Sequence, residues 1–169
     1  MATVIRGDDN FDSAFAKSVA VIADVKAYNG HGGASLSGVW QVRALNTELD
    51  DPSNIVTIAS NQFTLQAGTY LVEWSAPAYS ADRHSTKLYN ATDAITEADG
   101  TSSYNTPAAA IQTISTGSGV VTITSAKAFE IQHYIQTAKA LNGLGVNIES
   151  TTPNQNSVYT LVKIHKIGA

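Results

Sequence analysis

The sequence predicts an all-β sandwich of about ten antiparallel strands, and three observations support this prediction. Short runs rich in β-branched and aromatic residues recur from residue 18 to residue 167. Turn signals rich in glycine and asparagine separate these runs at short intervals. Within the longer runs, apolar and polar residues alternate with the period of two that strands require. This pattern is typical of two facing sheets rather than of alternating strands and helices.

Length and composition fit one domain with a packed core. The chain has 169 residues, of which 43% are hydrophobic, close to the usual value. Only 14% are charged, well below the usual figure of about 25%. We therefore expect neutral polar side chains on the surface. Residues 1–17 carry no sustained period, so we predict an N-terminal tether or short helix there and a single head domain over residues 18–169.

The predicted strands share alternate apolar positions and end at turn signals such as Asn29-Gly30. In order, they are residues 18–28, 38–46, 54–58, 63–65, 69–76, 84–90, 120–124, 128–136, 146–149 and 157–167. Between them, residues 93–107 are expected to form a loop and residues 113–119, with two glycines, a turn. Only residues 11–17 and 136–141 have a composition that a helix would tolerate.

Several classes of protein are disfavoured by composition. The net charge of -4 and the scattered basic residues argue against a nucleic-acid partner. No apolar run is long enough for a membrane-spanning helix, and the first residues lack the pattern of a signal peptide. We expect a protein made in the cytoplasm and carried out in a released particle. The absence of cysteine excludes disulfides and thiol chemistry.

Catalytic and metal-binding motifs are also missing, so we predict that the chain is not an enzyme and has no cofactor. Its four histidines stand in unrelated contexts, and no HExxH or GxSxG motif occurs. Asp8, Asn10 and Asp12 resemble the start of a calcium loop, but Ser13 and Val19 occupy the positions where glycine and glutamate are needed. A carboxylate pair for glycoside cleavage is defined by spatial distance, so a polysaccharide-degrading enzyme stays open as an alternative.

One segment carries a family resemblance. Residues 63–74, Phe-Thr-Leu-Gln-Ala-Gly-Thr-Tyr-Leu-Val-Glu-Trp, resemble the Phe, Gly-x-Tyr and alternating-aromatic segment of trimeric jelly rolls in the complement globular-head and tumour necrosis factor superfamily. Residues 84–90 and 158–164 resemble two further strands of that family. The resemblance implies a jelly-roll fold and a homotrimer. Residues 88–93, 119–124 and 129–134 are similar to head domains of tailed-bacteriophage fibres, spikes and decoration proteins, which implies a virion location.

A trimer would also explain strands with apolar residues on both faces. Leu71 and Val72 are adjacent, so their side chains lie on opposite faces of the strand. In the closing strand, Tyr159 and Leu161 lie on one face, and Val158 and Val162 lie on the other. The trimer interface or the core should therefore contain Tyr70, Trp74, His133 and Tyr159. For His133 two interpretations remain, a core histidine bonded to a backbone carbonyl or a ring of three histidines around a threefold axis.

The candidate ligand-binding residues are Tyr79, Arg83, His84 and Tyr104, since exposed aromatic rings stack on sugars. Tyr79 and Tyr104 are equally compatible with burial. We predict a homotrimeric head of a phage fibre or spike that binds a host-surface receptor, a glycan by this chemistry, and contacts other virion proteins through its N-terminal segment. The alternative is a capsid decoration or cement protein with a structural role.

Overall fold

The chain folds almost entirely into strands. The structure is a computed structural model that describes residues 18–147 and 155–168. Within these ranges it contains β1 (Val19–Lys26), β2 (Trp40–Val42), β3 (Thr47–Asp50), β4 (Val56–Ala59), β5 (Gln62–Leu65), β6 (Gly68–Tyr79), β7 (Asp82–Asn90), β8 (Ile95–Asp99), β9 (Ser103–Asn105), the 3-10 helix η1 (Pro107–Ala109), β10 (Gln112–Ile123), β11 (Lys127–Ile135) and β12 (Ser157–Gly168). No helix in the described ranges is long and apolar enough to cross a membrane.

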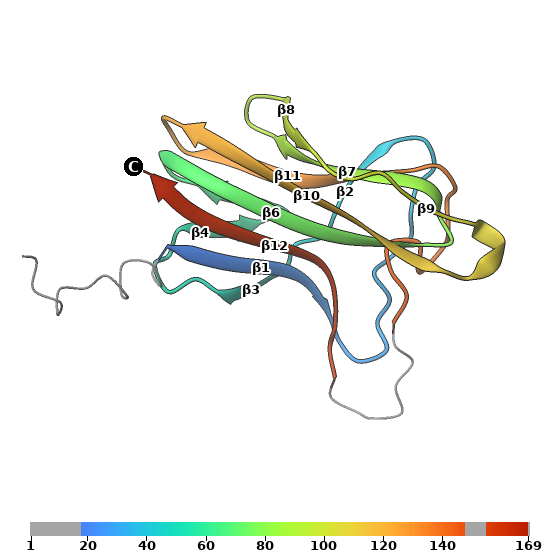
Figure 1. The fold of residues 1–169 in the computed structure, drawn as a ribbon. Helices are drawn as coiled ribbons and strands as arrows, with labels where there is room; N and C mark the ends of the chain where they lie inside the picture. Colours follow the sequence, from blue (N-terminus) through green and yellow to red (C-terminus); the bar gives the residue numbers. More distant parts are fainter. Residues whose placement is uncertain (1–17, 148–154, 169) are drawn as a thin grey trace, which may run out of the picture.

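The strands form two antiparallel sheets that lie face to face (Figure 1). The five-stranded sheet has the order β10-β6-β12-β1-β3. The seven-stranded sheet has the order β4-β5-β11-β7-β8, with β2 also paired to β11 and β9 also paired to β7. The predicted all-β jelly-roll sandwich is confirmed. The N-terminal segment that the sequence sets apart, residues 1–17, lies outside the described residues.

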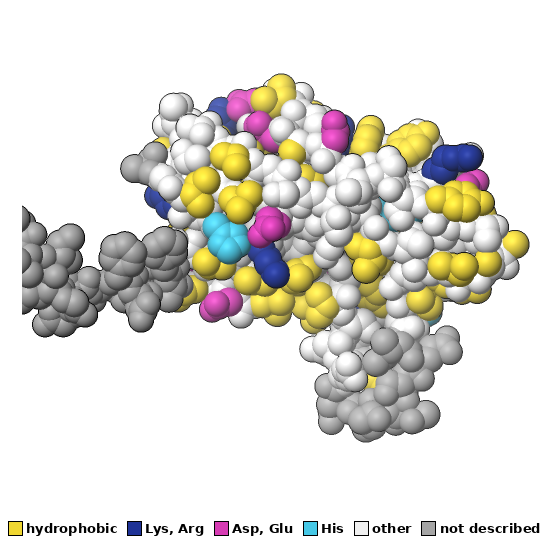
Figure 2. Space-filling model, in the orientation of Figure 1, with side chains coloured by type: hydrophobic (Ala, Val, Ile, Leu, Met, Phe, Trp, Pro, Cys, Tyr) yellow, Lys and Arg dark blue, Asp and Glu magenta, His cyan; other side chains and the backbone are white. Residues whose placement is uncertain are grey.

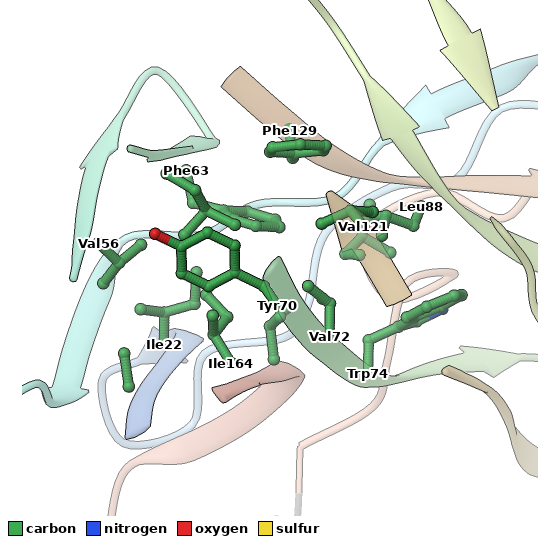
Figure 3. Close-up of a cluster of buried hydrophobic side chains, with 14 of the residues drawn as sticks. Ile22, Val56, Phe63, Tyr70, Val72, Trp74, Leu88, Val121, Phe129 and Ile164 are labelled. Carbon is green, nitrogen blue, oxygen red and sulfur yellow. The ribbon is translucent and has the colours of Figure 1, made fainter. Parts of the chain in front are cut away.

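Apolar side chains from both sheets meet in one large cluster in the interior (Figure 3). Phe63 and Phe129 stack with ring centroids 5.7 Å apart, and the Tyr70 hydroxyl donates to the Gln66 carbonyl over 3.0 Å. The buried members of the cluster are Ala20, Ile22, Leu45, Val56, Phe63, Leu65, Tyr70, Val72, Trp74, Leu88, Val121, Ile123, Phe129, Ile131, Val162 and Ile164. Burying each large side chain contributes roughly 1.5–3 kcal/mol, so this cluster is the main source of stability.

The turn predicted for residues 113–119 is wrong, because β10 runs through it without interruption and pairs with β6 along its whole length. Gly117 lies opposite Trp74 in this pairing. A Cβ atom on Gly117 would overlap the six-membered ring of Trp74. The glycine therefore gives the indole room to lie across the neighbouring strand, and it does not mark a turn.

The loop predicted for residues 93–107 is wrong in part, because it contains β8 and β9. Both strands pair with β7, β8 along Lys87–Asn90 and β9 along Asp82–His84. The alternation in these strands is too short to separate them from loop residues by sequence. Asp99 and Gly100 lie where the chain passes from one strand to the other, and the Gly100 amide donates to the Thr86 carbonyl over 2.7 Å.

Two further strand predictions fail in part, and a segment that a helix would tolerate is irregular. Of the strand predicted over residues 38–46, only residues 40–42 form a strand, β2, because residues 43–46 carry the chain from the seven-stranded sheet to the five-stranded one. Residues 136–141 are irregular and not helical; the Thr137 amide donates to the Ala81 carbonyl. Of the strand predicted at 146–149, residues 146 and 147 are not in a strand, and the rest lies outside the described residues.

A bulge in β12 changes which side chains of the closing strand face inward. Ala23 pairs with Leu161 and Val25 with Val158, so β12 holds one more residue than β1 between these two pairs. Tyr159 and Val162 are both buried, whereas Val158 is half exposed and Leu161 is partly exposed. The predicted grouping of Tyr159 with Leu161 is therefore wrong, since strict alternation does not continue through a bulge.

Replacing Gly117 with alanine should destabilise the fold by about 1–3 kcal/mol, because the added methyl group overlaps Trp74 and overpacks the interior. Urea unfolding at a fixed protein concentration measures the change. Ser118→Ala, at the next and exposed position of β10, is the matched control and should change the free energy of unfolding by less than about 0.5 kcal/mol. Equal effects of the two substitutions would contradict this role of Gly117.

Candidate functional site

Beside the apolar cluster, the interior has a polar part that contains a buried arginine, Arg43. Arg43 has no exposed surface, and its guanidinium donates to the Thr160 hydroxyl over 2.8 Å, the Pro77 carbonyl over 3.2 Å and the Leu144 carbonyl over 2.8 Å. Burial lowers the pKa of Arg43 to about 10, and the nearby Asp24 opposes this shift. The side chain is still protonated at neutral pH, so the interior contains a fixed positive charge.

Two histidines share a hydrogen bond close to this charge. His84 Nδ1 lies 2.9 Å from His133 Nε2, and His84 Nε2 lies 2.8 Å from the Thr113 hydroxyl. Burial, with a further contribution from Arg43, lowers the pKa of His84 to about 4. Burial also holds the pKa of His133 well below its usual value, and Arg43 and His84 add to this effect. Both rings are therefore neutral at pH 7.

The unpaired nitrogen of His133 fixes the tautomers of both rings. Within the described residues, the buried His133 Nδ1 has no hydrogen-bond partner. An unpaired buried N–H is costlier than an unpaired ring acceptor, so the His133 proton belongs on Nε2. His133 Nε2–H then donates to His84 Nδ1, and His84 Nε2–H donates to Thr113 Oγ1. The result is a directed chain of hydrogen bonds from the core toward β10.

A second set of hydrogen bonds joins the two sheets beside the histidines. The Trp74 indole N–H donates to the Thr86 hydroxyl over 2.8 Å, and that oxygen lies 2.8 Å from the Ser115 hydroxyl. Ser115 in turn donates to the Thr101 carbonyl over 2.6 Å. These contacts satisfy every named side-chain hydroxyl, so polar residues are tolerated in this part of the interior.

A hollow of about 410 Å³ opens on the surface above His84. Its lining comes from β7, β9, β11 and the segment before β9, and consists of Arg83, His84, Ser85, Ser102, Ser103, Tyr104 and Tyr134. The Arg83 guanidinium carbon lies 5.8 Å from the centroid of the Tyr104 ring, and Arg83 donates to the Gln136 side-chain carbonyl over 3.2 Å. The hollow thus presents hydroxyl groups, two aromatic rings and one exposed cation.

An aromatic shelf, defined as Trp40, Lys87, Tyr89 and Tyr134, continues from the hollow across the outer face of the seven-stranded sheet. Tyr134 belongs to both features, because it lines the hollow and its ring centroid lies 5.7 Å from that of Trp40. Lys87 Nζ lies 4.3 Å from the Trp40 centroid and 5.0 Å from the Tyr89 centroid. Cation–π attraction between these groups holds the lysine above the sheet.

Three of the four candidate ligand-binding residues come together at the hollow: Arg83, His84 and Tyr104. His84 contributes to the lining although only 2% of its surface is exposed, so it forms part of the floor. Tyr79 lies apart from the hollow. It is partly buried at the end of β6, and Lys139 Nζ lies 5.4 Å from its ring centroid. Ligand binding by all four residues stays a prediction.

The four residues expected in the trimer interface or the core are all buried inside the protomer. Tyr70, Trp74, His133 and Tyr159 are each less than 7% exposed. His133 bonds to His84 and not to a backbone carbonyl. Because His133 has no exposed surface, a ring of three His133 side chains around an axis would require the sandwich to open.

The shelf residues were not identified from the sequence. Alternation places Arg83, Ser85, Lys87 and Tyr89 on one face of β7, but both faces of the neighbouring strands contain apolar residues. The sequence alone therefore does not tell which face is external. The weak signal that was present is the single lysine between Ser85 and Tyr89, since a lysine rarely faces a core.

Metal binding finds no support in the described part of the chain. Residues 18–147 and 155–168 contain no group of three or more histidine, aspartate or glutamate side chains that could hold a metal ion. The calcium-like Asp8, Asn10 and Asp12 lie outside these residues.

Acid should destabilise the fold through the two histidines. The pKa of His84 is about 4 in the folded chain and 6.5 without the fold, so the unfolded chain binds more protons between these values. The free energy of unfolding should fall as the pH decreases from 6.5, by at most about 1.4 kcal/mol per pH unit for His84, and the part due to His84 should level off below pH 4. His133, whose pKa is lowered in the same direction, should add to the fall. Urea unfolding between pH 8 and pH 4, at roughly half-unit steps, measures it.

The double variant His84→Gln/His133→Gln should have a flatter pH profile than the wild type, because it cannot take up these protons. His165→Gln removes a partly exposed histidine from the outer face of the five-stranded sheet and is the control for loss of any histidine. A double variant with the unchanged wild-type slope would show that the buried pair does not carry the effect.

Comparison with known proteins gives a likeness in structure alone. No protein-family model matches the chain, and no curated protein matches it in sequence. Among solved structures, the globular domain of zebrafish complement 1qA protein superposes with a TM-score of 0.57 at 14% identity, covering 89% of this chain and 98% of that chain. Murine APRIL at pH 5.0 also gives 0.57, at 10% identity and with the same coverage.

Eiger TNF from S. frugiperda superposes with a TM-score of 0.53 at 12% identity, covering 89% of this chain and 92% of that chain. These identities are too low to transfer a ligand or an activity. The length covered and the two antiparallel sheets do define the architecture. The chain has the jelly-roll fold of the complement C1q globular heads and the tumour necrosis factor family, as the resemblance of residues 63–74 indicates.

Proposed function

We propose that the chain is a non-enzymatic head that assembles as a homotrimer on a bacteriophage fibre or spike and binds a host-surface glycan. The observation that carries this proposal is the hollow above His84 together with the adjoining aromatic shelf. Both lie on the outer face of the seven-stranded sheet, and the other sheet has a different surface suited to contact between copies.

The lining of the hollow fits the chemistry of a sugar. Ser85, Ser102 and Ser103 supply hydroxyl groups that both donate and accept, as the hydroxyls of a pyranose require. Tyr104 and Tyr134 supply flat apolar faces for the C–H side of the ring, together with polar tips. A concave site with aromatic walls and a few convergent polar groups is the usual form of a small-ligand site.

The outer face of the five-stranded sheet fits contact with sister copies. Hydrophobic side chains surround a small group of charged side chains and a histidine on the face seen in Figure 2. Exposed or partly exposed apolar side chains on this face include Leu71, Ile114, Val120 and Leu161. A hollow of about 150 Å³ beside Glu73 and Lys163 could receive a side chain from a neighbouring copy. Burying this face would remove apolar surface from water.

The virion location rests on the sequence. The segments at residues 88–93, 119–124 and 129–134 resemble head domains of phage fibres, spikes and decoration proteins. A decoration protein with a structural role remains the alternative. The hollow beside the aromatic shelf favours the binding role, because its serine hydroxyls match the hydroxyls of a sugar, whereas exposed aromatic rings alone would suit a protein partner equally well.

A non-enzymatic role agrees with the state of the two histidines nearest the hollow. His84 and His133 have lowered pKa values and bond to each other and to Thr113, so the nitrogens of His84 are occupied at neutral pH. The residues that line the hollow include no carboxylate, and glycoside hydrolysis ordinarily needs two.

Native mass spectrometry should detect a homotrimer of about 53 kDa, three times the chain mass of 17.8 kDa. Val120→Glu should shift the protein to single chains, because Val120 is 60% exposed in the protomer and a buried unpaired carboxylate is costly. Leu36→Glu, at a similarly exposed apolar residue before β2, should leave the trimer intact. A wild-type protein that is monomeric at micromolar concentration would rule out this assembly.

The purified protein should block adsorption of the parent phage to its host and should bind glycans from that host surface. Tyr104→Ala should weaken both effects by about tenfold or more, because it removes an exposed ring from the hollow. Leu49→Ala, at an exposed apolar residue of β3, should have no effect. Binding to capsids without any block of adsorption would favour the decoration role instead.

A further inference from the structure

We propose that the hollow and the aromatic shelf form one continuous site for an acidic glycan. In this site, sugar rings stack on Tyr134 and Trp40, and the carboxylates of the sugar meet Arg83 and Lys87. This assignment rests on the glycan-binding function proposed above and adds the charge class of the ligand and a second subsite.

The two cations are available to an anionic ligand. The Arg83 side chain is 74% exposed, and its one acidic contact among the described residues, Asp82, lies 3.9 Å away. An exposed ion pair at that distance is weak, so most of the five guanidinium donors stay free. Lys87 forms no ion pair with a described residue; its ammonium group lies above the rings of Trp40 and Tyr89. A planar carboxylate matches the fork of the guanidinium.

The acidic groups near the shelf do not cancel these charges. Glu130 is buried, and its two carboxylate oxygens accept hydrogen bonds from Gln62 over 2.9 Å and from Gln132 over 2.6 Å. Asp99 pairs with Lys87 in the register of β7 and β8, but no ion pair joins their side chains. It therefore adds a repulsive charge at the edge of the site, which provides a test of the proposal.

The register of the sheet sets the spacing of the site. Arg83 and Lys87 are four residues apart on the same face of β7, which places their Cα atoms about 13 Å apart. Tyr134 lies opposite Ser85, midway between them, and Trp40 lies opposite Tyr134 on the next strand. An aromatic ring therefore stands between two cations, an order that suits a stretch of several sugar rings with a carboxylate near each of its ends.

The site stays accessible in the proposed trimer. The shelf lies on the outer face of the seven-stranded sheet, and the apolar surface proposed for contact between copies lies on the five-stranded sheet. Three sites on one head would raise the avidity for a repeating polysaccharide.

The experiment measures binding of the full chain to matched sugars by isothermal titration calorimetry. The probes are oligogalacturonate, its methyl ester, in which the carboxylates are neutral, α-linked polysialic acid and neutral dextran. The wild type should bind at least one of the two acidic glycans, with affinity that decreases as salt is added. The affinity for the methyl ester should be lower than the affinity for oligogalacturonate by about tenfold or more, because the ester loses the charge-assisted hydrogen bonds.

Four charge variants test the two cations and their surroundings. Arg83→Gln and Lys87→Gln should each weaken binding of the acidic glycan by about tenfold. Asp99→Asn should strengthen it, since it removes the repulsive charge. Lys166→Gln, near the end of β12 in the other sheet, is the charge control and should have no effect.

Tyr134→Ala should abolish binding, whereas Tyr134→Phe should retain it, because stacking needs the ring and not the hydroxyl. Thermal unfolding of every variant separates loss of binding from loss of fold.

The possible results are distinct. Equal affinity for oligogalacturonate and its methyl ester, or binding to dextran alone, would overturn the acidic class and leave a glycan-binding head in place. Binding of an acidic glycan that is unaffected by Arg83→Gln and Lys87→Gln would overturn the location. A chain that binds no sugar in this panel and does not block phage adsorption would overturn both this inference and the proposed function.

Discussion

The burial of one positive charge, the Arg43 guanidinium, is the constraint on which the polar half of the molecule depends. It joins the crossing segment after β2 to β6, β12 and the segment around Leu144 through three hydrogen bonds. Removing such a group without its partners would leave acceptors unsatisfied, so its surroundings are fixed as a unit. The same charge helps to keep His84 and His133 neutral, which allows the two rings to bond to each other. The floor of the hollow is thus set from the interior.

Two kinds of interaction hold the interior of the sandwich together, apolar burial and hydrogen bonding. The large apolar cluster around Phe63, Tyr70 and Phe129 gives stability through burial and specifies little beyond size and shape. The hydrogen-bonded layer around Trp74, Thr86 and Ser115 gives a fixed geometry, because each donor needs one acceptor in one direction. The candidate site lies above this polar part. A surface that must hold several side chains in a set arrangement benefits from a floor with directional bonds.

The sequence was informative where alternation and turns agree, as in β6, β7 and β11, and uninformative where one residue has a tertiary role. Gly117 resembles a turn residue but is needed beside Trp74, a fact that only the pairing of β10 with β6 reveals. The bulge of β12 depends on its partner strand in the same way. At the site, Arg83, His84 and Tyr104 were recognised by residue type, and pairing of β7 with β9 brings them together. Trp40 and Tyr134 were missed because a period of two does not say which face is external.

The placement of the site on regular strands has a consequence for how this surface changes in evolution. Along β7 the inward row of His84, Thr86 and Leu88 carries the packing, while the outward row of Arg83, Ser85 and Lys87 carries the chemistry. Exchanges in the outward row leave the interior undisturbed, because the side chains of the two rows lie on opposite faces of the strand. A few point substitutions could therefore change the chemistry of the candidate site, with no insertion, no new loop and no loss of the scaffold.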